Sequence, residues 1–137
     1  MQKTLVDSGP LIALFDHSDK HHTRIVDFLK DYPGVLVSTW QVATEVCHLL
    51  NFSVNAQLDF LRWIQRGGLT LDNFAETAIS RIVEMTDKYR DRPMDLADAS
   101  LVVLSAQTGI RDILTLDSDF DIYRLPDKSR LRNVLAE

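Results

Sequence analysis

Four carboxylates border an otherwise apolar stretch of the sequence: Asp95, Asp98, Asp117 and Asp119. The first two fall at the expected start of a helix, and the other two follow an expected strand. Moving a carboxylate out of water costs free energy unless another group compensates its charge. No Lys or Arg lies between Asp95 and Gly109, so neighbours in the sequence do not supply that compensation. The pattern therefore favours a bound metal cation.

Two further acids occupy positions from which they could join such a site. Asp7 directly follows the run 3–6, which is typical of a short buried strand. Glu45 lies at the edge of the apolar stripe of an expected helix, where it is either a surface glutamate or a ligand. Mg2+ prefers oxygen ligands and keeps several waters, so a few carboxylates from separate elements suffice. Asp7, Glu45, Asp98 and Asp117 are thus candidates for a catalytic metal site that activates water against a phosphorus atom.

Strands and helices alternate along the sequence. We expect strands near 3–6, 35–37, 69–71 and 113–116, and helices near 10–15, 19–32, 39–50, 55–66, 74–89 and 95–107. This order predicts parallel βαβ units in a three-layer α/β/α sandwich with a central, mostly parallel sheet. In such sheets the functional site lies beyond the carboxyl ends of the strands. The tail from 121 to 135 alternates like a β-hairpin.

Composition limits the classes of protein to consider. The 137 residues predict one domain over 1–137, and the mean hydropathy of -0.08 is typical of soluble globular proteins. No apolar run is long enough to span a bilayer, so we expect a cytoplasmic protein that does not associate with membranes. The net charge of -5 argues against tight nucleic-acid binding through a broad basic surface. A metal-dependent nuclease remains compatible, because its site concentrates carboxylates.

Other metal and hydrolase motifs fit poorly. The run that starts at Asp117 resembles an EF-hand loop, but its sixth position is Ile122 and its twelfth is Lys128. Glu45 and His48 match the Glu-x-x-His of di-iron helices, yet no second copy exists. The sequence also lacks a nucleophile elbow and a Walker A motif.

The ordered motifs resemble PIN-domain proteins of the VapC toxin type. They are Leu5-Val6-Asp7-Ser8-Gly9-Pro10-Leu11-Ile12-Ala13, Thr44-Glu45-Val46, Asp98-Ala99, and Leu114-Thr115-Leu116-Asp117-Ser118-Asp119-Phe120. The resemblance covers nearly the whole chain. It implies a PIN-like, Rossmann-like fold and an endoribonuclease that uses Mg2+ or Mn2+.

The resemblance also implies roles for individual residues. Asp7, Glu45 and Asp98 take the first three acidic positions of the family, and Asp117 and Asp119 share the fourth. It leaves open which of these two contributes.

Two more residues have supporting roles by the same resemblance. Thr115 matches a hydroxyl residue that supports the last acid. Asp95 either caps its helix or adds an outer contact to the metal site.

The leading hypothesis is a Mg2+-dependent endoribonuclease that prefers single-stranded RNA and serves as the toxin of a toxin–antitoxin pair. Family members are usually homodimers held inactive by an antitoxin, so we expect both partners. The alternatives are a PIN-like nuclease that is not a toxin, a binding module with idle acids, and a phosphatase for small phosphomonoesters. The cations to test for phosphate contact are Arg111, Arg124, Lys128, Arg130 and Arg132.

Overall fold

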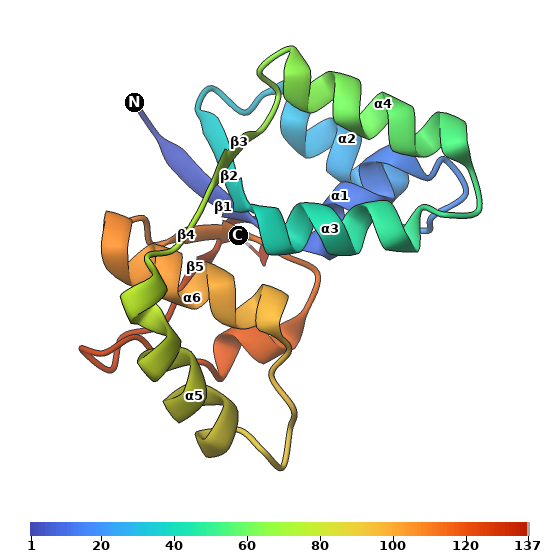
Figure 1. Ribbon diagram of the computed structural model, residues 1–137. Coiled ribbons are helices and arrows are strands. Elements are labelled where there is room, and N and C mark those ends of the chain that lie inside the picture. The colour runs from blue at the N-terminus through green and yellow to red at the C-terminus, as the bar shows by residue number, and fades with distance from the viewer. Residues whose placement is uncertain (137) are drawn as a thin grey trace.

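A five-stranded sheet forms the centre of the computed structural model, which describes residues 1–136 (Figure 1). The strands are β1 (Lys3–Val6), β2 (Val35–Thr39), β3 (Thr70–Asp72), β4 (Asp112–Leu114) and β5 (Arg132–Asn133). Their order is β3-β2-β1-β4-β5, and every pair is parallel. The prediction of a mainly parallel α/β sheet is therefore confirmed.

Helices cover both faces of this sheet. The α-helices are α1 (Ser8–Phe15), α2 (His22–Lys30), α3 (Trp40–Leu49), α4 (Val54–Gln65), α5 (Ile79–Lys88) and α6 (Leu96–Thr108). Three short 3-10 segments are η1 (Glu76–Ala78), η2 (Ser118–Asp121) and η3 (Val134–Ala136). Right-handed crossovers place α1 to α4 on one face, and the reversed step from β3 to β4 places α5 and α6 on the other. Figure 1 shows these two groups of helices on opposite sides of the strands, which gives the three-layer α/β/α sandwich.

The strand order reverses beside β1. The chain moves outward from β1 to β2 and β3, then returns to add β4 on the other side of β1. Leu5 pairs with both Val37 and Ile113, and all three side chains are buried. Such a reversal leaves a crevice at the carboxyl ends of the two central strands, where ligands bind in open α/β sheets.

The helix α6 is enclosed by the rest of the protein. Every residue from 97 to 105 is buried, in keeping with a sequence that is apolar almost all round. Asp95 caps the start, because its side chain accepts a hydrogen bond from the Asp98 backbone. Gly109 ends the helix with a positive φ of 81°. The cap therefore fixes the residue at which α6 begins, and with it the position of Asp98 in the first turn of the helix.

Some predicted elements differ from the structure. The helix expected over 74–89 is divided into η1 and α5, and the helix expected over 19–32 is shortened to α2. The expected hairpin in the tail is wrong, since β5 pairs in parallel with β4. The tail instead starts at the end of η2, runs on without a strand, and returns to the sheet edge through a tight loop near Lys128. Alternation alone does not distinguish a strand from a short turn followed by extended chain.

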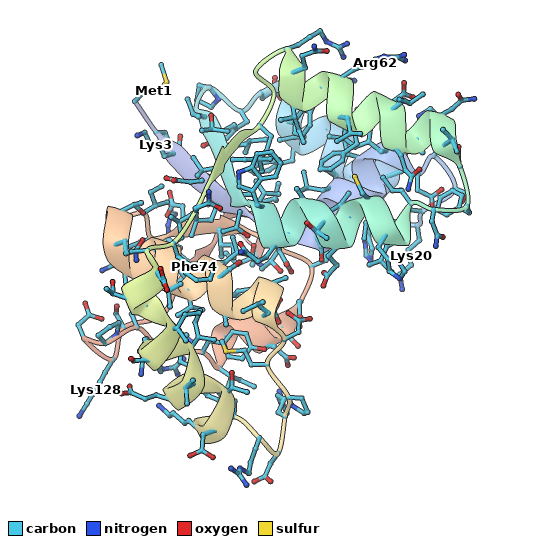
Figure 2. All side chains as sticks on the ribbon, viewed as in Figure 1. Met1, Lys3, Lys20, Arg62, Phe74 and Lys128 are labelled. Carbon is cyan, nitrogen blue, oxygen red and sulfur yellow. The ribbon has the colours of Figure 1, made fainter. Side chains whose placement is uncertain are left out.

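Side chains fill the spaces between the helices and the sheet (Figure 2). The largest fully buried ones include Phe60, Phe120, Met85 and Leu101, so the core extends to both sides of the sheet. Within residues 1–136, no helix combines the length and the apolar character needed to cross a membrane.

Candidate active site

Three carboxylates meet at the crevice beside β1. Asp7, Asp98 and Asp117 each offer an oxygen, and these oxygens lie within 4.8 Å of one another. Asp7 follows β1, Asp117 follows β4 and Asp98 lies in the first turn of α6. Elements that are far apart in the sequence thus deliver three acids to the carboxyl end of the sheet.

Asp7 is held by two hydrogen bonds. It caps α1, and its Oδ1 accepts a hydrogen bond from the Ser8 backbone N–H at 2.8 Å. Its Oδ2 accepts a hydrogen bond from the Thr115 hydroxyl at 3.0 Å. The same hydroxyl oxygen accepts the Asp117 backbone N–H at 3.0 Å, so Thr115 links two of the acids. This position agrees with the supporting role expected for Thr115.

Asp98 has a partner that the sequence did not indicate. The hydroxyl of Tyr123 donates to its Oδ2 at 3.2 Å, and both side chains are buried. The ring of Tyr123 packs edge-on against Tyr89 and Phe120. Tyr123 belongs to the tail expected as a hairpin, and such a hairpin predicts no contact with α6. One signal in the sequence could have indicated that Tyr123 is buried: it lies three residues after Phe120, an apolar residue of η2.

The two candidates for the fourth acid differ in their contacts. Asp117 belongs to the group of three, and its Oδ1 accepts the backbone N–H of Asp119 at 2.9 Å. The side chain of Asp119 instead forms an ion pair with Arg92 at 3.1 Å. Asp119 is therefore engaged outside the cluster.

Glu45 and Asp95 lie next to the cluster but outside this group of three. Glu45 is half-buried on α3 and close enough for its charge to act on Asp7. Both acids line a pocket of about 450 Å3 between α3 and the start of α6. Asp95 serves as the cap of α6, which is the plainer of the two roles expected for it.

The pKa values of the clustered acids are raised. Burial is the main cause for Asp7, whose pKa rises to about 6. Burial also raises the pKa of Asp98 to about 8, and the charges of Asp7, Asp95 and Asp117 add to the effect. Burial and the neighbouring Asp98 raise the pKa of Tyr123 as well, so this phenol stays a hydrogen-bond donor. Buried carboxylates that repel one another favour a cation that compensates them.

The donor set fits a hard divalent cation. All three groups are carboxylates, which is the ligand type of Mg2+ and Mn2+, and no Cys or His belongs to the group. Within residues 1–136, no Lys or Arg forms an ion pair with any of the three. Residues 1–136 thus supply no positive side chain that is paired with these carboxylates. A bound metal ion would compensate their charge.

Most cations of the tail have structural partners. Arg111 donates to the Ser105 carbonyl, and Arg124 donates to the carbonyls of 121–123. Arg132 forms a two-fold hydrogen bond with Asp112. Lys128 and Arg130 are exposed. The first three are therefore weaker candidates for phosphate contact than the sequence suggested.

Buried hydroxyl groups tie together the elements that carry the cluster. Thr39, at the end of β2, hydrogen-bonds Ser100 of α6 at 2.7 Å, and Ser100 also donates to the Ala97 carbonyl. Ser38 donates to the Val6 carbonyl at 2.7 Å and so ties β2 to β1. Sequence reasoning missed these links, because they join elements that no local pattern connects.

Comparisons with known proteins agree with this geometry. The family model for the PIN domain matches residues 4–125. The chain is 30% identical over 115 residues to Ribonuclease VapC26 of Mycobacterium tuberculosis, which covers 82% of this chain and 85% of the relative.

A solved structure shows the same fold. The crystal structure of Mycobacterium tuberculosis VapC20, described as a Sarcin-Ricin loop cleaving toxin, superimposes with a TM-score of 0.78 at 18% identity. The match covers 87% of this chain and 93% of that one. The predicted resemblance to PIN-domain ribonucleases of the VapC type is confirmed, and the chain belongs to the PIN-domain family.

Proposed function

We propose that this protein is a Mg2+-dependent endoribonuclease, with Mn2+ as an alternative metal. The observation that carries the proposal is the convergence of Asp7, Asp98 and Asp117 within 4.8 Å at the switch point of the sheet. Glu45 completes the proposed catalytic set with these three acids, and Asp119 has an outer role through Arg92.

The chain's own residues hold the acids in place for this chemistry. A bound divalent cation supplies the polarisation of a phosphate oxygen and a lowered pKa for an attacking water. Thr115 and the Ser8 N–H fix the two oxygens of Asp7, and Tyr123 fixes Asp98. These contacts orient the carboxylates before any ligand arrives, which is the role that hydrogen-bonded neighbours have in metal sites.

The relatives support RNA as the substrate. One is named a ribonuclease, and the other is described as a toxin that cleaves the Sarcin-Ricin loop. We therefore infer a toxin role in the cytoplasm, a cognate antitoxin and a homodimer for this chain. Light scattering of the purified protein tests the dimer. Growth arrest on expression, relieved by the product of the neighbouring gene, tests the toxin role.

Cleavage of single-stranded RNA tests the activity itself. We expect cleavage with Mg2+, none with EDTA, and a loss of at least 100-fold for Asp98→Asn, because this change removes a ligand charge and keeps the shape. Asp59→Asn, on the exposed surface of α4, is the matched control and should cleave normally. Metal-dependent cleavage by Asp98→Asn at the parent rate would refute the site.

The alternatives have separate outcomes in the same experiment. A binding module with idle acids would neither cleave RNA nor bind divalent metal in calorimetry. Turnover of a generic phosphomonoester without RNA cleavage would favour a phosphatase.

A further inference from the structure

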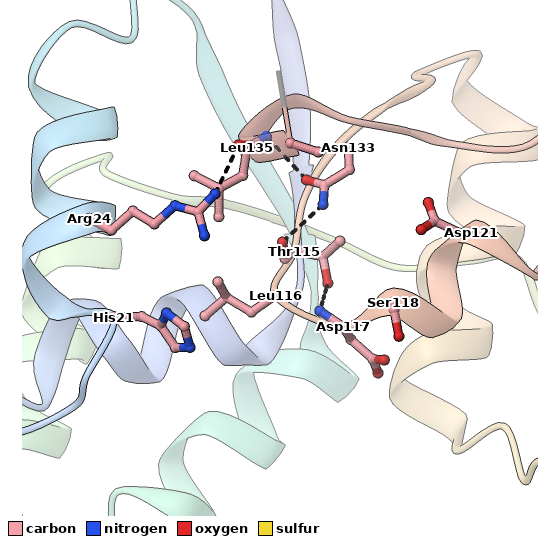
Figure 3. A pocket seen from close by; sticks show the side chains of 10 residues that line it. His21, Arg24, Thr115, Leu116, Asp117, Ser118, Asp121, Asn133 and Leu135 are labelled. Atoms are coloured by element: carbon pink, nitrogen blue, oxygen red, sulfur yellow. Dashed lines mark hydrogen bonds between the residues drawn. The ribbon is translucent and has the colours of Figure 1, made fainter.

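A small polar pocket adjoins the Asp117 side of the acidic cluster (Figure 3). Its volume is about 220 Å3, and it lies between the first turn of α2, the segment that follows β4 and the C-terminal turn. His21 and Arg24 form one wall, while Asp117 and Ser118 lie opposite. The pocket thus shares one acid with the candidate metal site and extends away from it.

The pocket contains hydrogen-bond donors that the fold uses only in part. Arg24 has five N–H donors, and within residues 1–136 its one hydrogen bond runs from Nη2 to the Leu135 carbonyl at 3.2 Å. Neither the imidazole of His21 nor the hydroxyl of Ser118 forms a hydrogen bond with another residue of this described part. Three donors on facing walls are therefore open to a ligand.

Other residues around the pocket are already engaged. Asn133 donates to the Thr115 carbonyl and accepts the Leu135 backbone N–H, so its amide serves the fold. Arg92 is paired with Asp119 of η2 and does not line the pocket. Arg24 is thus the Lys or Arg residue that lines this pocket, and its guanidinium geometry suits phosphate oxygens.

We propose that Arg24, His21 and Ser118 bind the RNA phosphate next to the one being cleaved. This inference rests on the proposed ribonuclease function and names the residues that place the strand. The pocket is smaller than the roughly 300 Å3 at which pockets for drug-sized ligands begin, so it suits a phosphate group better than a whole nucleotide.

The negative charges around the pocket limit which phosphate can bind there. Asp117 and Asp121 also line it and repel a free anion. The pocket should therefore hold a phosphate that belongs to a strand already bound at the metal site. We therefore expect that inorganic phosphate does not measurably inhibit RNA cleavage, at phosphate concentrations too low to precipitate the metal.

Arg24→Gln tests the proposal, with Arg24→Lys and Arg66→Gln beside it. Arg66 is exposed at the end of α4, and its change removes the same charge elsewhere. For a single-stranded RNA oligonucleotide with Mg2+, we expect Arg24→Gln to raise KM about tenfold at nearly unchanged kcat. The contact holds substrate and transition state alike. Arg24→Lys keeps the charge and should recover part of the affinity, whereas Arg66→Gln should match the parent.

The salt dependence of binding separates phosphate contact from a structural role, since Arg24 also holds the C-terminal turn. Loss of one phosphate contact should reduce the slope of log K against log[NaCl] by about 0.7 for a single strand. A general loosening of the turn would lower the melting temperature without changing the slope. His21→Gln and Ser118→Ala, which break no hydrogen bond within residues 1–136, should raise KM without a change in melting temperature.

Two negative results have different meanings. A parent protein that cleaves no RNA with any divalent metal would contradict the proposed function. A parent that cleaves RNA while Arg24→Gln, His21→Gln and Ser118→Ala keep its KM and salt slope would overturn this inference alone. That second result would leave the pocket to a different ligand, such as an acidic segment of a protein partner.

Discussion

Replacing Asp98 by Asn should stabilise the metal-free protein. Asp98 is 8% exposed, and within residues 1–136 the Tyr123 hydroxyl is the one hydrogen-bond donor to its carboxylate. Burial and the charges of Asp7, Asp95 and Asp117 raise its pKa from 3.8 to about 8. Asn keeps the shape and can still accept the hydrogen bond from Tyr123, but it carries no charge to desolvate.

The sign and size of this change in stability follow from the pKa shift of Asp98 on folding. Because the folded pKa lies above the unfolded value, the stability that Asp98 contributes is complete below about pH 4 and is lost as the pH rises to about 8. A rise of about 4 pKa units at 1.36 kcal/mol each gives roughly 5–6 kcal/mol as an upper limit for that loss. We expect a measured difference of several kcal/mol between pH 5 and pH 8.

Urea unfolding in EDTA, repeated at each pH, is the assay. The free energy of unfolding of Asp98→Asn minus that of the parent should increase from pH 5 to pH 8, whereas Asp59→Asn should show no such trend. Added Mg2+ should reverse the order, because it stabilises the protein that binds it. A difference that stays flat with pH, or a variant that is less stable than the parent at pH 8 in EDTA, would refute the reasoning.

The remaining predictions concern the neighbours of the cluster. Tyr123→Phe leaves Asp98 without its hydrogen-bond donor, so RNA cleavage at neutral pH should fall about tenfold while the melting temperature changes little. Asp117→Asn should reduce cleavage far more than Asp119→Asn, because Asp119 is paired outside the cluster; equal losses would contradict this assignment. Thr115→Val removes a buried hydroxyl with two partners and should lower the free energy of unfolding by about 1–3 kcal/mol in urea, with Thr115→Ser near the parent.

The sequence was informative where local rules and function coincide. Asp7 and Asp98 were predictable, because one follows a strand and caps a helix while the other interrupts an apolar helix. Because parallel strands have their carboxyl ends at the same edge of the sheet, acids that follow such strands could be expected to lie close together. The same rules predicted the layers and the central sheet.

Contacts set by tertiary packing were not predictable from the sequence. Tyr123 reaches Asp98 only because η2 turns the chain back under α6, and the expected hairpin would have sent it elsewhere. The pairing of Asp119 with Arg92 joins η2 to the loop before α6, and no local pattern connects the two. Arg24 was overlooked for the same reason, since a cation on an exposed helix looks like any solvated residue until its neighbours across the crevice are known.

The burial of α6 ties activity to the integrity of the whole protein. Asp98 lies on the helix whose residues from 97 to 105 are all shielded from solvent, and Thr39 anchors that helix to the sheet. Buried segments of this kind open mainly with global unfolding, whereas exposed loops open locally, and the cap by Asp95 holds the first turn of α6 closed. The acid therefore cannot drift out of place while the rest of the molecule stays folded. Active molecules and unfolded molecules should be the two main populations, with few folded but misaligned ones between them.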